Sequence, residues 1–323
     1  MQLVLDSRGM TVGKRNNCFF LKTETHERLI SPLKVSSIAV LSACHLSSAA
    51  IHLAAANQIP IYFMDAFGDV VARLGGASYG QMADLRRKQV KFAETPAATT
   101  WCVGLFEHKS QGQQAHLAFL CEKVKSQQAA LQAVMAMLRQ ETQELGQVSG
   151  LLADQADWLR GKEGNMARQY WQVLSDCLPE GFRFESRNRQ PAQDPFNAAL
   201  NYLYGMLYGV VETALFSAGL DPYLGIMHAD QYGKPVLSYD LIEPFRPWID
   251  QLLMEQFLAD AIAVSFFDAD AEGVRLNKAG KRVIIPLFHA FIQEKIMFQD
   301  AQATRRNHIF RMAGALKERI DEF

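Results

Sequence analysis

The chain has 323 residues, of which 49% are hydrophobic and 21% are charged, and its formal net charge is −1. The composition is that of an ordinary globular protein, and the length is sufficient for two domains. The near-zero charge excludes an overall electrostatic attraction to polyanions, so any nucleic-acid surface must be a local patch.

Cysteine usage and hydropathy indicate the compartment. The chain has five cysteines, widely spaced and without a CxxC pair, which argues against a disulfide framework or a structural zinc site. The first residues lack the basic region and long apolar core of a secretory signal. The most apolar long stretch, 38–56, is interrupted by His45 and His52 and falls short of a membrane span. We therefore expect a cytoplasmic protein that does not enter a membrane.

The first 74 residues are mostly typical of strands. Apolar, β-branched or aromatic runs predict strands over 2–6, 18–25 and 35–42, and the runs 59–65 and 69–74 predict a hairpin that turns through 66–68. The Ala-rich segment 47–57 predicts one helix with Ser47 as its N-cap. No catalytic grouping occurs in this region, so we interpret it as a structural or dimerising β-domain.

The segment Gly75–Gly80 has three glycines and a serine in six residues, which is typical of a turning or flexible joint. We place the domain boundary there, with a β-rich domain over 1–76 and a larger α-helical domain over 77–323. The fold class expected is therefore α+β.

From about residue 81 the pattern is helical. Leu117, Leu120, Val124, Leu131, Val134 and Leu138 form an apolar stripe, which predicts core rather than a ligand site. Further on, Asp194 and Pro195 predict a helix start and Gly219 predicts its end. After Trp248 the pattern is again helical to the end of the chain.

The segment 161–168 contains Glu163. Considered alone, Glu163 is most simply an acidic residue in the first turn of a helix, favoured by the helix dipole. Three short basic clusters are interpreted either as solvated surface or as phosphate contacts. They comprise Arg86, Arg87 and Lys88; Arg275, Lys278, Lys281 and Arg282; and Arg305 and Arg306.

The segment 219–248 carries the densest polar chemistry. A short apolar run leads to His228 in a polar loop, and the next element brings Asp240 and Glu243 three residues apart. If that element is helical, the two carboxylates share one face. An imidazole and two carboxylates are what a divalent-metal site needs. The alternative, a core histidine beside a solvated acidic face, remains open from spacing alone.

An ordered series of motifs over about 160–250 resembles the CRISPR-associated integrase family, the catalytic subunit of the spacer-acquisition complex. The N-terminal region and the Gly-rich joint fit that family more loosely. The matching segments are KEG at 162–164 with Arg168, RNRQP at 187–191, DPFN at 194–197, LNYLY at 200–204, AGLDP at 218–222, LGIMH at 224–228 and YDLIEPFR at 239–246.

The resemblance implies a small β-domain followed by a larger helical catalytic domain, and it implies a metal triad at Glu163, His228 and Glu243. Asp240 is implied as a supporting carboxylate of the catalytic site. The third metal position is Asp in some relatives and Glu here, and either carboxylate binds Mg²⁺ or Mn²⁺. A histidine ligand shifts the preference towards Mn²⁺ without excluding Mg²⁺.

The implied activity is metal-dependent phosphoryl transfer on double-stranded DNA, as an endonuclease and integrase in antiviral defence. The 3′-hydroxyl of a captured fragment would attack a phosphodiester at the repeat boundary of a CRISPR array. The implied assembly is a homodimer with a small companion subunit. The residues expected against DNA phosphates are Lys162, Arg168, Arg187, Arg189 and, most favoured, Arg246, which shares an element with Glu243.

Two other functions are compatible with the residues. In a non-catalytic helical DNA-binding or scaffold protein, the acids and the histidine would be structural. In another metal-dependent nuclease, the same site would act on a different nucleic acid, including RNA.

Overall fold

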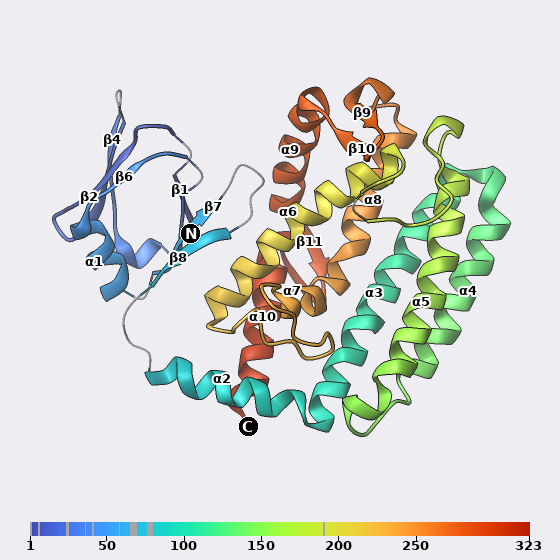
Figure 1. Cartoon of the computed structure of the whole chain (residues 1–323), viewed down its shortest axis with the longest axis horizontal. Coiled ribbons are helices and arrows are strands. Elements are labelled where there is room, and N and C mark those ends of the chain that lie inside the picture. The colour runs from blue at the N-terminus through green and yellow to red at the C-terminus, as the bar shows by residue number, and fades with distance from the viewer. Residues whose placement is uncertain are drawn as a thin grey trace.

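The computed structural model describes residues 2–5, 7–23, 26–35, 37–40, 42–57, 59–64, 70–75, 80–189 and 191–323. A β-rich N-terminal region stands beside a larger helical region, and helix α2 runs along the base of the latter (Figure 1). The α+β fold class expected from the sequence is confirmed.

The described part of the N-terminal region forms two four-stranded sheets. In the first sheet, β1, β5 and β7 are parallel and β8 pairs antiparallel with β7. In the second, β3 pairs antiparallel with β4 and β2, and β2 pairs parallel with β6. The bounds are β1 Gln2–Leu5, β2 Thr11–Arg15, β3 Cys18–Lys22, β4 Glu27–Ile30, η1 Pro32–Lys34, β5 Ser37–Val40, β6 His45–Leu46, α1 Ser48–Ala56, β7 Ile61–Met64 and β8 Val70–Leu74.

The predicted strands and helix of this region are present. The Ser47 hydroxyl accepts a hydrogen bond from Ala50 N at 3.2 Å, which confirms Ser47 as the N-cap of α1. The predicted hairpin is also present, but its turn at 66–68 lies outside the described residues. Most of the Gly-rich joint, 76–79, lies outside them too, so the boundary between domains 1–76 and 77–323 remains a prediction.

Helices dominate the second region. The bounds are α2 Gly80–Ala93, α3 Pro96–Lys123, η2 Lys125–Gln127, α4 Gln128–Leu145, α5 Leu152–Cys177, η3 Glu180–Phe182, α6 Pro195–Ala218, α7 Val236–Leu241, η4 Glu243–Phe245, α8 Arg246–Leu258, η5 Val264–Phe266, α9 Lys278–Gln293 and α10 Arg305–Asp321. Two hairpins interrupt them, formed by β9 Phe267–Asp270 with β10 Gly273–Leu276 and by β11 Lys295–Phe298 with β12 Ala301–Thr304. The uninterrupted helical pattern expected after Trp248 is therefore wrong in these two places.

The apolar stripe expected between Leu117 and Leu138 is core, but it is divided between two helices. α3 ends at Lys123, and after the short turn η2 the chain continues as α4, which packs against α3. Leu117, Leu120 and Leu131 are all fully buried. The helical spacing of apolar residues continues from α3 into α4 because both helices bury their apolar faces in the same core.

Helix α6 begins and ends where the sequence predicts. The Asp194 carboxylate accepts from Asn197 N at 2.7 Å, Pro195 is the first helical residue, and Gly219 ends the helix with a φ of 86°. α6 crosses the middle of the helical region (Figure 1). Near its C-terminal end, Ser217 lies 3.1 Å from the hydroxyl of the buried Tyr62 on β7. This contact joins the two regions.

None of the described helices is both long enough and apolar enough to cross a membrane.

Candidate functional site

Two predicted site carboxylates reach one point from different helices. Glu163 lies in the interior of α5, eleven residues after the helix starts at Leu152. The interpretation of Glu163 as a first-turn acid is therefore wrong, because α5 extends a long way N-terminal to the segment 161–168. Glu243 is the first residue of η4, and one residue, Ile242, separates it from the end of α7. Side chains held by separate packed helices are positioned by the core rather than by local sequence.

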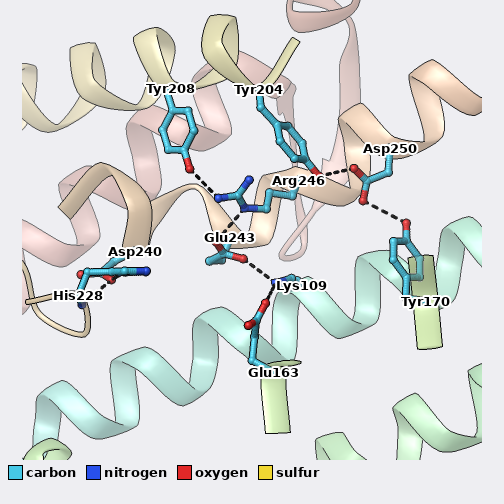
Figure 2. Close-up of polar contacts among 10 residues, drawn as sticks. All are labelled: Lys109, Glu163, Tyr170, Tyr204, Tyr208, His228, Asp240, Glu243, Arg246 and Asp250. Carbon is cyan, nitrogen blue, oxygen red and sulfur yellow. Dashed lines mark hydrogen bonds and ion pairs between the residues drawn. The ribbon is translucent and has the colours of Figure 1, made fainter. Parts of the chain in front are cut away.

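Lys109 stands between these two carboxylates. Its Nζ lies 2.5 Å from Oε1 of Glu163 and 2.7 Å from Oε2 of Glu243, and its side chain is 12% exposed. Lys109 comes from α3, so three elements meet at one ammonium group (Figure 2). The Oε2 atom of Glu243 is buried and has this ion pair, but it has no hydrogen bond of acceptable geometry within the described chain.

Arg246 neutralises the other oxygen of Glu243. Its Nε donates to Oε1 of Glu243 at 2.8 Å, and another guanidinium nitrogen donates to the Tyr208 hydroxyl at 2.6 Å. The guanidinium also lies over the Tyr204 ring, 4.7 Å from the centroid. Arg246 is thus fixed between Glu243 and an aromatic shelf on α6, which leaves Lys109 as the cation that bridges both carboxylates.

The charges of this group are strongly coupled. Burial alone raises the pKa of Glu243, but the neighbouring Arg246 and Lys109 outweigh it and lower that pKa to about 2. Burial alone lowers the pKa of Lys109, but Glu243 and Glu163 outweigh it and raise that pKa. Glu243 is therefore a carboxylate and Lys109 an ammonium at neutral pH.

His228 is oriented by Asp240. Its Nδ1 lies 2.5 Å from Oδ1 of Asp240, while the side chain is 45% exposed and that of Asp240 is 1% exposed. The hydrogen bond with Asp240 raises the pKa of His228, against the opposing effect of burial. With Nδ1 engaged, Nε2 is the ring nitrogen left for a ligand. A carboxylate behind the imidazole is the usual outer-shell support of a metal-binding histidine.

Asp240 also holds the backbone that carries His228. Its Oδ2 accepts from Ile226 N at 2.9 Å and from Met227 N at 3.1 Å, and its Oδ1 accepts from His228 N at 3.2 Å. A tight turn at Gly225 permits this wrapping, because a Cβ there would lie 2.1 Å from the carbonyl oxygen of His228. Asp240 is in α7 and Glu243 in the next turn, so the two acids that the sequence places together have different partners.

One cleft of about 900 Å³ contains all four predicted site residues, Glu163, His228, Asp240 and Glu243, in its lining. Within the described residues, however, no three His, Cys, Asp or Glu side chains are close enough to hold a metal as they stand. In Figure 2 the His228–Asp240 pair lies to one side of the ion pairs that link Glu163 to Lys109 and Lys109 to Glu243.

The residues fit a divalent cation in their chemistry. Two carboxylates supply hard oxygens and His228 supplies an imidazole nitrogen, a donor set suited to Mn²⁺ and compatible with Mg²⁺. The buried Oε2 of Glu243, which among the described residues has an ion pair with Lys109 but no hydrogen bond, is an atom that a cation would satisfy. Glu163, His228 and Glu243 are thus the residues that could hold the ion, with Asp240 behind His228.

The basic residues predicted to contact DNA have different surroundings. Arg189 is exposed and Arg168 is exposed with a hydrogen bond to Asn165, and both line a second cavity of about 390 Å³ next to Glu163 and Glu243. Arg187 also lines it, but its guanidinium donates to the amide oxygens of two asparagines on α6. Lys162 points elsewhere, at 2.7 Å from Glu141 and 2.5 Å from Glu144.

A buried polar network beside the site was not predicted. Asp250 accepts hydrogen bonds from the hydroxyls of Tyr204 at 2.5 Å and Tyr170 at 3.1 Å (Figure 2). His116 Nδ1 lies 2.7 Å from the Tyr170 hydroxyl. Burial raises the pKa of Asp250 to about 7, although the two tyrosines lower it, and burial lowers that of His116 to about 3. A polar residue at an apolar position of a predicted helix is the signal that marks Asp250 in the sequence.

Comparisons with known proteins agree on one family. The sequence profile described as "CRISPR associated protein Cas1" matches residues 3–290. The chain is 31% identical over 304 residues to the CRISPR-associated endonuclease Cas1 1 of Thermus thermophilus, covering 92% of this chain and 88% of that protein. It is 30% identical over 278 residues to the CRISPR-associated endonuclease Cas1 2 of Rhodospirillum rubrum, covering 80% and 79%.

Solved structures show the same fold. A casposase bound to an integration product superposes with a TM-score of 0.76 at 22% identity, covering 99% of this chain and 95% of that one. A Cas1 protein from Thermotoga maritima superposes with a TM-score of 0.68 at 21% identity, covering 99% and 96%.

Proposed function

The chain belongs to the Cas1 family of CRISPR-associated proteins, and from this membership and the site geometry we propose that it is a metal-dependent DNA endonuclease and integrase. In this function it inserts captured DNA fragments into a CRISPR array, using the 3′-hydroxyl of the fragment as the nucleophile. Curated relatives that align with most of this chain are named endonucleases, and one protein of the same fold was solved bound to an integration product.

The observation that carries the proposal is the shared cleft of Glu163, His228 and Glu243. The three residues come from α5, from the loop after α6 and from η4, and all three line the same cleft. The cleft also has Arg189, Tyr208 and Tyr239 in its lining. Cationic and aromatic side chains around a carboxylate cluster suit a DNA strand, which needs its phosphates neutralised and its bases stacked.

The residues have distinct roles in this chemistry. A divalent ion, when bound, supplies stabilisation of the charge that develops on the attacked phosphate and lowers the pKa of the attacking hydroxyl. Glu163 and Glu243 would provide its oxygen ligands, and His228 would provide a nitrogen ligand. Asp240 fixes the orientation and tautomer of His228. Arg246 holds one oxygen of Glu243 and so fixes the rotamer of that carboxylate.

The DNA contacts proposed for the basic residues differ in strength of support. Arg168 and Arg189 line the cavity beside the carboxylates and are exposed, so both are available to phosphates. Arg187 and Arg246 donate hydrogen bonds to protein groups, Arg187 to Asn197 and Arg246 to Glu243, so we assign them to holding site residues in place rather than to contacting DNA. Lys162 is paired with two glutamates, so a phosphate contact there would require those pairs to open.

The proposed setting is a cytoplasmic homodimer that works with a small companion subunit. Complexes of Cas1 with Cas2 are among the solved structures of this fold, which supports a companion of that kind. The β-rich region, which carries no catalytic grouping, is the part that we assign to dimer formation.

Strand joining tests the proposal directly. A short duplex with 3′-hydroxyl ends is incubated with supercoiled plasmid, with Mn²⁺ or with EDTA, using wild type, Glu163→Ala and His228→Ala. We expect Mn²⁺-dependent nicking and joining by wild type, and loss of both by each variant while circular dichroism shows that the fold is retained. Full joining by either variant would contradict the site.

The companion subunit provides the control. If wild type binds DNA but joins nothing, adding the companion subunit separates an incomplete complex from a non-catalytic DNA-binding protein. Competition between DNA and RNA substrates of equal length separates the integrase from a nuclease that acts on RNA.

A further inference from the structure

The inference concerns Lys109, which neither the sequence motifs nor the proposed chemistry assigns a role. Its Nζ lies within 2.7 Å of one oxygen from each of Glu163 and Glu243. The contact with Glu163 is a charge-assisted hydrogen bond and the contact with Glu243 is an ion pair, and the side chain is largely buried. A cation that touches both carboxylates stands where a divalent ion bound by the same two groups would have to contact them.

The charge balance makes the two occupants exclusive. Two carboxylates, Glu163 and Glu243, face two cations, Lys109 and Arg246, so the group is neutral as it stands. A divalent ion added to this set without any departure would leave a net charge of two in a partly buried place, which is costly. One cation must leave, and Arg246 is held by Tyr208 and packed on Tyr204.

Lys109 has both the freedom and the space to leave. Lysine carries a point charge on a flexible stem of four carbons, and its hydrogen bonds to carboxylates do not depend on a rigid fork. Lys109 also lines the cavity of about 390 Å³, whose lining includes the acidic Glu185 besides three arginines. A displaced ammonium therefore has an adjoining polar space to enter.

We propose that Lys109 is a placeholder cation, which keeps Glu163 and Glu243 together in the ion-free protein and is displaced by the divalent ion that binds them. The inference rests on the proposed metal site and adds an ion-exchange step to it. Lys109 is thus a positioning residue, because it keeps Glu163 and Glu243 next to one shared cation while no ion is bound.

The first test uses wild-type protein and follows Lys109 itself. Brief acylation of lysine amines, read by mass spectrometry, is carried out with and without Mn²⁺ at constant ionic strength, because salt alone weakens ion pairs. We expect Lys109 to be labelled several times faster with Mn²⁺. Lys162, which bridges Glu141 and Glu144 in the same way but outside the site, should be labelled at the same rate in both conditions.

The second test measures Mn²⁺ affinity by calorimetry and by the paramagnetic resonance of the free ion. Lys109→Met removes the competing charge and leaves two carboxylates without their shared cation. We expect Mn²⁺ to bind this variant about tenfold more tightly or better. Lys109→Arg retains a cation that pairs with carboxylates through a rigid fork, so it should bind Mn²⁺ no more tightly than wild type. Lys162→Met should stay near wild type.

The outcomes separate the two proposals. Mn²⁺ binding that His228→Ala abolishes, combined with unchanged labelling of Lys109, would overturn the placeholder and leave the metal site standing. Equal or weaker Mn²⁺ binding by a folded Lys109→Met would do the same. If Lys109→Met does not fold, the labelling of wild type decides alone. Absence of any Mn²⁺ binding that depends on His228 would overturn the metal site and the placeholder with it.

Discussion

Asp250 shows how a single buried group can make the stability of this protein depend on pH. It is 1% exposed, and its two oxygens accept hydrogen bonds from Tyr204 and Tyr170. Its pKa is about 7 in the fold because burial disfavours the carboxylate more than the two hydroxyls favour it. In the unfolded chain the pKa of this side chain returns to its ordinary value of 3.8.

The sign of the pH dependence follows from that difference. Between about pH 4 and pH 7 the folded protein binds a proton at Asp250 that the unfolded chain has lost. We expect this stabilising contribution to be full below about pH 4 and to fall as pH rises to 7, by at most about 1.4 kcal/mol per pH unit. Urea unfolding from pH 4.5 to 7.5 on wild type and Asp250→Asn measures it.

The asparagine variant provides the matched control. Its amide keeps the shape of the protonated acid and does not titrate, so its unfolding free energy should lack this component. Parallel curves for the two proteins over that range would contradict the raised pKa of Asp250.

At the scale of the element, the loop between α6 and α7 depends on Gly225. Any Cβ at this position would lie 2.1 Å from His228 O and 3.0 Å from a methyl carbon of Val236, and backbone cannot yield as a flexible side chain can. The loop would have to move, and with it the imidazole that Asp240 orients.

We therefore expect Gly225→Ala to lower strand-joining activity and to destabilise the protein by about 1–3 kcal/mol. Gly161→Ala on α5 is the control, because nothing lies within 4 Å of its Cβ and helix propensity alone should stabilise it by about 0.5–1 kcal/mol. Chemical denaturation together with the joining assay measures both. A fully active and stable Gly225→Ala would mean that the turn is looser than its geometry indicates.

The elements also show what sequence alone can supply. α6 is predicted to the residue because Asp194, Pro195 and Gly219 each satisfy a backbone requirement at a helix end. The division of one apolar stripe into α3 and α4 is not predictable in that way, because both helices present the same period to one core. The position of Lys109 in the site cannot be predicted from the sequence for a related reason. Lys109 is not part of a sequence motif, and it contacts Glu163 and Glu243 only because α3, α5 and η4 pack together in the fold.

At the scale of the molecule, Tyr62 couples the β-rich region to the helical one. Its side chain is fully buried, its hydroxyl lies 3.1 Å from Ser217 Oγ, and its ring lies 6.3 Å from that of Phe216. The contact joins β7 to the C-terminal half of α6, the helix that also carries Tyr204 and Tyr208 of the site.

We expect Tyr62→Ala to destabilise the protein by about 3–5 kcal/mol and to separate its calorimetric unfolding into two transitions. Tyr62→Phe keeps the ring and loses the hydroxyl contact with Ser217, so it should cost about 1 kcal/mol and leave one transition. If the two variants were equally stable, the ring would not hold the regions together.

Because Lys109 and Arg246 already neutralise Glu163 and Glu243, the helical domain can finish folding before any ion arrives. Small zinc domains behave differently, since their ligands repel or stay disordered until metal supplies the folding energy. If the proposed metal site holds, synthesis of the folded protein and activation of its site are separate events. The protein would then be folded but inactive until a divalent ion and DNA are both supplied.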